Sequence, residues 1–431
     1  MSLRLTPLAV VLSAAAVFAA DPPEPKFRAV TIDDKIQIGY GVAVADVDGD
    51  GKPDVLLADK KQFVWYRNPT WEKFVLAENL TEKDNVCLAA QDLDGDGKCE
   101  IAVGAEWNPA DTEKSGAVFY LIPPADRTQR WEPVKFPSVE PTTHRMKWIK
   151  LDDRENHRDT DSTERKDKAA AAYPSVPSVS SVVKNEWGLV VVPLHGRGNK
   201  NGEGAPVKVL CYVKPADPRA GWKAEVVDES MHMTHNFDVV RTGGIRVIGK
   251  EGVTVILKAR AGDKAGQWVS IPMSSHADAG WAFVAENGGG ELRGGKLPGA
   301  GLVATVEPMH GNALVAYVST TQSPARRRHV LNDKLVEGHA LACGDVLNSG
   351  GDQIVVGWRG KPGQTDSTTG VSVWSPLDPE GGKWRETVVD PDGMACEDLV
   401  LADLNADGKL DIVTSGRATK NVKIYLNETP R

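Results

Sequence analysis

Short apolar segments recur along this chain, and clusters of Gly, Asp, Asn and Pro separate them. Many of these segments are rich in valine, isoleucine and other residues that favour strands, as in 54–58, 101–104 and 412–415. Long amphipathic helical periods do not occur in the sequence. Short β-branched segments between turn residues are typical of strands. The pattern therefore predicts an all-β protein.

Acidic loops link several of these strands in pairs. The first loop, 46–54, has carboxylates at alternate positions, a glycine at its sixth place and a further carboxylate at its end, and loops 92–100 and 403–411 repeat this pattern. Calcium takes six to eight oxygen ligands, and this spacing matches the first half of an EF-hand loop, although strands replace the helices here. We therefore expect about three structural calcium sites, the alternative being polar turns without metal. The predicted ligands are Asp46, Asp48, Asp50, Asp54, Asp92, Asp94, Asp96, Glu100, Asp403, Asn405, Asp407 and Asp411.

A fourth loop, 345–352, is a degenerate copy of the same pattern. It has lost the middle carboxylates and, by comparison with the other loops, one residue. We expect it to be a polar turn without calcium.

The repeated strand units predict a β-propeller, in which four-stranded sheets surround a central channel. Taking the chain in order, seven blades can be placed, so the predicted fold class is an all-β, seven-bladed propeller with calcium-binding hairpin loops. The predicted blades start near Gly41, Val86, His144 and His235, continue through a fifth that includes 302–306 and 313–317, and end with two that start at His339 and Glu397. A single domain over 21–431 is expected, with a charged surface insertion at about 152–172.

Composition narrows the cellular setting and the partners. Residues 1–20 combine Arg4, an apolar run and small residues before Asp21, which is the pattern of a secretory signal peptide. No later apolar run is long enough to span a membrane. The formal net charge of −8 argues against a nucleic-acid partner. We expect a soluble protein that is exported to the periplasm or the medium. Its five cysteines are an odd number without metal-binding spacing, and most are expected to be small buried residues.

Candidate catalytic residues follow from the position of polar residues at the start of the inner strands. We count six residues back from the first position of the acidic loop to the start of the inner strand. This count gives His339 in blade six and Glu397 in blade seven, and the equivalent count in blade four gives His235. His144 opens blade three in a similar setting, and Glu307 and His310 flank a turn after a strand of blade five. Imidazoles and carboxylates that meet at one channel mouth suit zinc or another divalent metal, and the same groups suit acid–base catalysis.

Two levels of family resemblance accompany these motifs. The strand–DxDxDG–strand units resemble FG-GAP/VCBS repeats, which implies calcium-bound propeller blades. The segments 234–236, 288–291, 307–312, 337–340, 357–359, 396–398 and 416–419 are similar to the propeller domain of aldos-2-ulose dehydratase. That resemblance implies dehydration of a ketosugar such as 1,5-anhydrofructose, with Arg359, Arg417, Asn236 and Asp398 at the substrate. The fungal members also carry cupin domains, which this sequence lacks, so no cupin-dependent isomerisation is expected.

Two classes of function stay open at this point. The first is a sugar-modifying lyase with its site at the channel mouth, and the second is a non-catalytic module that binds a glycan or a protein. The grouped histidines and acids favour the enzyme. Channel histidines can also be purely structural, hydrogen-bonded residues, and the oligomeric state and the identity of any channel metal do not follow from the sequence.

Overall fold

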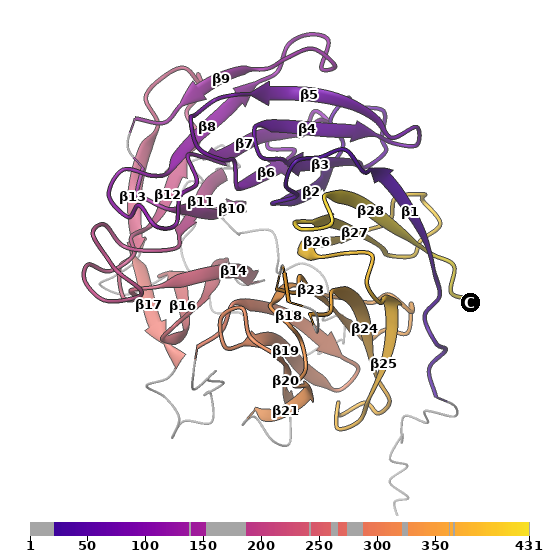
Figure 1. The fold of residues 1–431 in the computed structure, drawn as a ribbon. Coiled ribbons are helices and arrows are strands. Elements are labelled where there is room, and N and C mark those ends of the chain that lie inside the picture. Colours follow the sequence, from indigo (N-terminus) through magenta and orange to yellow (C-terminus); the bar gives the residue numbers. More distant parts are fainter. Residues whose placement is uncertain are drawn as a thin grey trace, which may run out of the picture.

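The structure is a computed structural model that describes residues 21–137, 139–151, 187–240, 243–259, 266–273, 288–320, 326–361, 363–364 and 367–430. Within these ranges, 28 strands form seven four-stranded antiparallel sheets around a central axis, and no α-helix occurs (Figure 1). The prediction of an all-β, seven-bladed propeller is confirmed. The signal peptide at 1–20 and the insertion at 152–172 lie outside the described residues. Nor is there, in the described ranges, any helix long and apolar enough to cross a membrane.

The first four blades follow one another without interruption in strand order. Blade 1 comprises β2 (Val42–Ala45), β3 (Asp54–Ala58), β4 (Gln62–Arg67) and β5 (Glu72–Glu78). Blade 2 comprises β6 (Cys87–Gln91), β7 (Glu100–Ala105), β8 (Ala117–Ile122) and β9 (Glu132–Lys135). Blade 3 comprises β10 (Thr143–Lys150), β11 (Trp187–Pro193), β12 (Val209–Val213) and β13 (Lys223–Asp228). Blade 4 comprises β14 (Thr234–Val240), β15 (Gly244–Gly249), β16 (Gly252–Lys258) and β17 (Trp268–Pro272).

The last three blades bring the chain back to its beginning. Blade 5 comprises β18 (Glu291–Leu297), β19 (Ala300–Glu307), β20 (Ala313–Thr320) and β21 (Arg327–Asn332). Blade 6 comprises β22 (Gly338–Gly344), β23 (Gln353–Trp358), β24 (Gly370–Pro376) and β25 (Trp384–Asp390). Blade 7 comprises β26 (Cys396–Ala402), β27 (Asp411–Gly416), β28 (Asn421–Asn427) and β1 (Phe27–Asp33).

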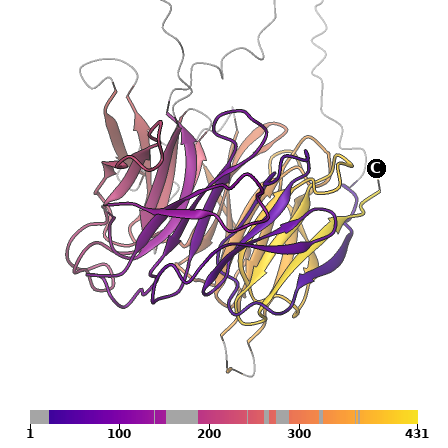
Figure 2. The same cartoon turned by 90° about the horizontal axis from the view of Figure 1, so that it is seen from above.

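The N-terminal strand closes the ring, a feature that the sequence pattern did not predict. β1 pairs antiparallel with the C-terminal strand β28, from Phe27 opposite Asn427 to Asp33 opposite Val422. In the view of Figure 2 this indigo strand lies against the yellow strands of blade 7. Both chain ends therefore belong to one sheet, and backbone hydrogen bonds hold the first and last blades together.

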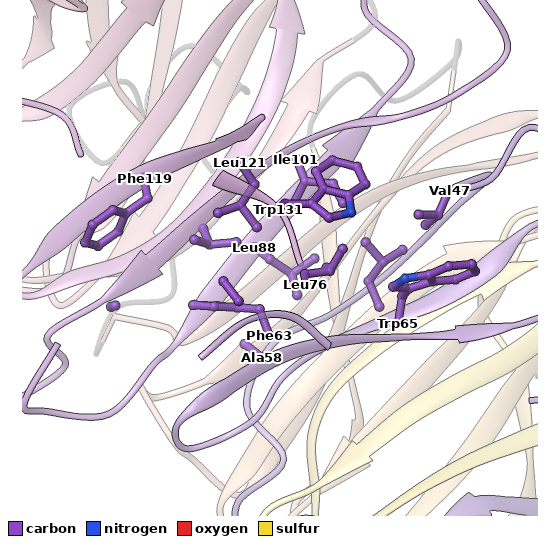
Figure 3. Close-up of a cluster of buried hydrophobic side chains, with 14 of the residues drawn as sticks. Val47, Ala58, Phe63, Trp65, Leu76, Leu88, Ile101, Phe119, Leu121 and Trp131 are labelled. Carbon is purple, nitrogen blue, oxygen red and sulfur yellow. The ribbon is translucent and has the colours of Figure 1, made fainter. Parts of the chain in front are cut away.

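Middle strands are apolar on both faces because each blade is packed between two others. In β3, Leu56 faces a cluster shared with blade 2, and Val55 and Leu57 face a cluster shared with blade 7. Figure 3 shows the first cluster, in which Trp65 and Leu76 of blade 1 meet Ile101 of blade 2. Alternation with a period of two thus supplies one apolar face to each neighbour, as expected for strands buried on both sides.

The cysteines take part in this packing rather than in disulfides. None of the five forms a disulfide, four are buried and Cys343 is partly buried. Burial raises the pKa of the Cys87 thiol to about 12, so this group stays protonated. The expectation of small buried residues is met at Cys87, Cys99, Cys211 and Cys396.

Candidate functional site

Four polar residues occupy the same position in four blades. His144, His235, His339 and Glu397 are each the second residue of an inner strand, β10, β14, β22 and β26. At each of them the pairing with the next strand skips one residue, for example between Thr234 and Asn236. Such a bulge leaves the extra residue out of the ladder and re-aims its side chain. The four residues are buried and lie at one end of the central channel.

Hydrogen bonds between blades fix the tautomer of the three strand histidines. Nδ1 of His144 lies 2.8 Å from the carbonyl oxygen of His235, and Nδ1 of His235 lies 2.8 Å from that of Gly290. Nδ1 of His339 lies 2.6 Å from the carbonyl oxygen of Glu397. A carbonyl oxygen only accepts, so each Nδ1 carries the proton and donates. Each Nε2 is left with a lone pair, which is the state of a metal-binding imidazole.

A fourth histidine comes from a turn in blade 5. His310 lies between β19 and β20 with a positive φ of 52°, and a Cβ on Gly311 would lie 2.2 Å from the carbonyl oxygen of Glu307, so this turn requires glycine there. The turn brings Nε2 of His310 to 2.8 Å from Nε2 of His235. One ring nitrogen from each of His235, His310 and His339 lies within 4.8 Å of the others. We call these three residues the histidine cluster.

Burial keeps the imidazoles of His144, His310 and His339 neutral. Desolvation, followed by the nearby guanidinium of Arg359, holds the pKa of His339 well below its usual value. Desolvation and the neighbouring Arg145 do the same for the pKa of His144. For His310, desolvation and then His235 lower the pKa to about 2. Neutral imidazole is the form that binds a metal or accepts a proton.

Glu397 places a carboxylate beside the histidine cluster. Its Oε1 lies 3.8 Å from Nε2 of His339 and accepts from Arg417 at 3.1 Å, and its Oε2 accepts from Arg359 at 2.8 Å. Burial raises the pKa of this carboxyl, but the two guanidinium groups outweigh burial and the net pKa is lowered. Glu397 is therefore ionised, and Arg359, which also donates to Glu337 at 3.1 Å, holds it in place.

The structure also shows a carboxylate that sequence reasoning missed. Glu291 is the first residue of β18, the inner strand of blade 5, and its Oε1 lies 3.3 Å from Nδ1 of His235. Its Oε2 accepts from the amide of Asn236 at 2.7 Å. Blade 5 has no acidic loop after its inner strand from which to count, so the count that found His339 had no starting point here. The sequence signals for this strand start are the glycine run 288–290 directly before Glu291 and the family resemblance of the segment 288–291.

Most of the other sequence-predicted site residues lie at the histidine cluster or next to it, and Glu307 does not. Arg359, Arg417 and Asn236 hold buried carboxylates of the site, while the rings of His144 and His235 lie with centroids 4.7 Å apart. Asp398 lines the channel beyond the cluster and accepts from the backbone N–H of Val42 at 3.1 Å.

Glu307 lies away from the histidine cluster. Its carboxylate accepts from Thr305 and Tyr317 at 2.7 Å, and from Arg328 at 2.7 Å, which are residues of β19, β20 and β21. The structure therefore does not bring Glu307 to the histidines, because its side chain turns toward the outer strands of its own blade.

Two hollows on the strand-start side give access to the cluster. One, of about 270 Å³, is lined by Leu194, Met233, Lys250, Pro308, Met309 and His310. The other, also of about 270 Å³, is lined by Glu337, Arg359, Gly360, Lys361, Arg417 and Ala418. A molecule in these hollows would contact His310 and the two arginines that hold Glu397.

The acidic loops lie at the other ends of the inner strands. Asp46, Asp48 and Asp50 each offer an oxygen within 4.8 Å of the others, and so do Asp92, Asp94 and Asp96. Both oxygens of Asp46 accept backbone N–H groups within the loop, from Gly49 at 2.7 Å and Gly51 at 2.8 Å. The third loop repeats this fold, with Gly408 donating to Asp403 at 2.8 Å and Asp407 donating to Asn405 at 3.1 Å. Lys52 and Arg67 pair with two of the first loop's carboxylates.

The closing carboxylates tie each loop to its sheet. Asp54, Glu100 and Asp411 are buried and accept the backbone N–H of the second loop residue at 2.9, 2.8 and 2.9 Å. Burial raises the pKa of Asp54 and of Glu100 to about 7. Their role as calcium ligands stays a prediction.

The fourth loop keeps the full spacing of the other three, so the prediction that it has lost one residue is wrong. Gln353, not Asp352, takes the place of Asp54, because it pairs with Gly344 as Asp54 pairs with Ala45. Its Oε1 accepts from the N–H of Leu347 at 2.9 Å, which is the third loop residue instead of the second. No residue has been lost in this loop. An amide replaces the closing carboxylate.

One repeat of the chain matches a known protein family. Residues 46–103 match the FG-GAP-like repeat family, and this range covers the first two acidic loops. No curated protein matches the chain.

Among solved structures, a streptogramin B lyase is similar with a TM-score of 0.49 and 11% identity, over 93% of this chain and 98% of that one. A structure of the mitotic checkpoint complex matches with a TM-score of 0.48 and 11% identity, over 99% and 97%. The extracellular domain of a putative one component system from B. thetaiotaomicron matches with a TM-score of 0.47 and 9% identity, over 93% and 39%. The chain is thus a seven-bladed β-propeller that carries an FG-GAP-like repeat at residues 46–103.

Proposed function

We propose that this protein is an exported, calcium-stabilised propeller lyase that dehydrates a ketosugar of the 1,5-anhydrofructose or aldos-2-ulose type at the histidine cluster. The observation that carries the proposal is the meeting of three imidazoles, neutral or fixed as lone-pair donors, beside the ionised Glu397. Nε2 of His235 and Nε2 of His310 face each other at 2.8 Å, so a shared proton or a metal ion would link the two rings.

The cluster fits a divalent transition metal. The Nδ1 hydrogen bonds of His235 and His339 to backbone carbonyls supply the outer support that metal-bound histidines need. His235, His310 and His339 would hold the ion, with Glu397 as the adjacent carboxylate. Such an ion supplies Lewis acidity, which polarises a carbonyl oxygen.

The remaining residues have separate roles in the proposed dehydration. The reaction removes a proton next to the carbonyl and releases a hydroxyl group as water. Nε2 of His144, which is not among the proposed ligands, would accept that proton, and the imidazolium, which burial disfavours, would return it to the departing hydroxyl. Trp107 stacks on this ring with centroids 5.0 Å apart and holds its orientation. Arg359 and Arg417 fix Glu397, and the hollow beside them would receive sugar hydroxyls.

The calcium loops belong to the same proposal as structural sites. The shared geometry of the first three loops supports oxygen ligation by Asp46, Asp48 and Asp50, by Asp92, Asp94 and Asp96, and by Asp403, Asn405 and Asp407. These loops lie at the strand ends that are remote from the histidines. Calcium there would stiffen the blades and would take no part in the chemistry.

The test is turnover of 1,5-anhydrofructose, followed by the ultraviolet absorbance of the unsaturated ketone and by mass spectrometry for the loss of water. We expect His310→Ala and His339→Ala to abolish turnover and His144→Phe to lower kcat by about 10²–10⁴-fold. His232→Ala is the matched control, because the His232 side chain is partly exposed and contacts Glu251, away from the histidine cluster. Full turnover in the three site variants would overturn the proposal. Wild-type protein that holds a transition metal but turns over no ketosugar would favour the non-catalytic binding module.

A further inference from the structure

The central channel beyond the histidines contains a separate cavity of about 440 Å³. Inner strands of all seven blades line it, and none of the four histidines described above does so. It begins at the layer of Arg145, Asn236 and Asp398, one residue further along their strands than the histidines, and continues toward the ends that carry the acidic loops. The histidine cluster and this cavity thus occupy successive parts of the channel.

Arg145 is buried in the wall of this cavity without full partners. Its side chain is 9% exposed, and Nε and Nη2 have no hydrogen-bond acceptor. The nearest carboxylates are Glu291, with Oε1 at 4.0 Å, and Asp398, with Oδ2 at 3.9 Å, and both distances exceed a hydrogen bond. Oε1 of Glu291 has only a 3.3 Å contact with Nδ1 of His235, whose proton is already donated to the carbonyl oxygen of Gly290, so it can accept a further donor. Leaving buried polar groups unpaired is costly, so a ligand that pairs them is expected.

The spacing of these groups indicates what the ligand must offer. A gap of about 4 Å between a guanidinium nitrogen and a carboxylate oxygen accommodates one bridging oxygen. That oxygen must accept from the guanidinium and donate to the carboxylate, and a hydroxyl group does both. A carboxylate group lacks the required donor, and an ammonium group lacks the acceptor.

The charge of the cavity favours the same conclusion. The cations Arg145, Lys147 and Arg293 are matched by the anions Asp238, Asp398 and Glu291, which contact or line the same space. A wall of balanced charge attracts neither an anion nor a cation strongly. Apolar residues such as Trp148 and Leu341 complete the lining and suit the C–H faces of a sugar ring.

We propose that this cavity is a second, non-catalytic site that binds a neutral polyol of monosaccharide size, whose hydroxyl groups bridge Arg145 to Glu291 and Asp398. It is independent of the histidine cluster and does not require the lyase activity. Because none of the four histidines lines this cavity, it would bind the polyol without acting on it.

The experiment is calorimetric titration of the full-length mature protein with D-fructose, D-glucose and myo-inositol, and separately with inorganic phosphate and acetate. We expect at least one polyol to bind with a Kd on the order of 1 mM. It should also change the tryptophan fluorescence, and this change should be lost in Trp148→Phe. Phosphate and acetate should give no heat.

Two variants test the location of the site. Arg145→Gln removes the unpaired guanidinium, and Ala342→Phe narrows the cavity without touching a charge. Each should weaken polyol binding at least tenfold, and folding is checked by circular dichroism. His232→Ala, at a residue outside both the histidine cluster and the cavity, serves as the control and should bind the polyol as the wild type does. Absence of binding by all three polyols, tighter binding of phosphate, or unchanged binding in Ala342→Phe would each overturn the proposal.

Discussion

Replacing Lys147 by methionine should stabilise the protein in a manner that depends on pH. Lys147 lies on β10 beside the channel cavity, with its ammonium group 5.6 Å from the ring centre of Phe237. Desolvation, and next the positive charge of Arg293, lower its pKa from 10.5 to about 8, although Asp238, Asp398 and Glu291 act in the opposite direction. Folding therefore disfavours the charged form of this lysine.

The size and sign of the effect follow from that shift. A change of one pKa unit corresponds to about 1.36 kcal/mol, so the shift from 10.5 to about 8 is worth roughly 3 kcal/mol. Below pH 8 the lysine is protonated in both the folded and the unfolded states, and the full penalty applies. Between pH 8 and 10.5 the unfolded state binds more protons, so the stability of the wild type rises with pH. Methionine has a similar shape and no charge, so the variant lacks this penalty at every pH.

The measurement is the free energy of unfolding of Lys147→Met and wild type, from urea titrations at intervals between pH 6 and pH 11. We expect the variant to be more stable by roughly 3 kcal/mol at neutral pH and to lose this advantage by about 1.4 kcal/mol per pH unit above pH 8. Tyrosines that titrate in this range are common to both proteins and cancel in the difference. A constant difference across the whole range, or a less stable variant at neutral pH, would refute the reasoning.

Three further predictions concern the loops and the ring closure. Chelation of calcium should lower the melting temperature, because an ion present at a concentration of 100 times its Kd stabilises the fold by about 2.7 kcal/mol per site. In differential scanning calorimetry, Asp46→Asn should reduce this decrease in melting temperature, and Asp345→Asn in the fourth loop should not. Asp54→Ala, which leaves the N–H groups of Val47 and Asn68 without their acceptor, should cost about 2–5 kcal/mol in urea unfolding, whereas Asp50→Ala in the presence of chelator should cost far less. Deletion of β1 should open blade 7 and give a clearly lower melting temperature than a deletion that ends before Phe27, and equal melting temperatures would show that this strand does not secure the ring.

Much of the fold was accessible from the sequence because the acidic loops mark the same point in several blades. Counting back from Asp345 and Asp403 found His339 and Glu397, and both lie where the count placed them, each at a strand bulge. The count depends on a marker after the inner strand. Blade 5 has none, since β18 runs into β19 through a turn near Gly299, so Glu291 was missed.

The direction in which a side chain points from a turn could not be predicted from the sequence. Glu307 and His310 are three residues apart in one turn, yet Glu307 is held by Tyr317 and Arg328, while His310 reaches the cluster. Periodicity identifies the strand but does not give the rotation of a turn. Similarly, Arg359 and Arg417 were expected to contact substrate, and only the structure shows that Glu397 lies between them.

The pairing of the first and last strands could not be read from local pattern either. β1 and β28 are separated by nearly the whole chain, and their pairing depends on the number of strands between them. The alternating residues of β1 fit the edge of any sheet. Only the closed ring decides that this edge belongs to blade 7.

The most direct test of the account is the transition-metal content of the purified mature protein, measured by inductively coupled plasma mass spectrometry after removal of loosely bound ions. We expect about one equivalent of zinc, manganese or a similar ion in the wild type and in His232→Ala, and much less than one in His310→Ala and His339→Ala. An equal metal content in all four proteins, or none in any of them after incubation with these ions, would contradict the claim that the histidine cluster is a metal site.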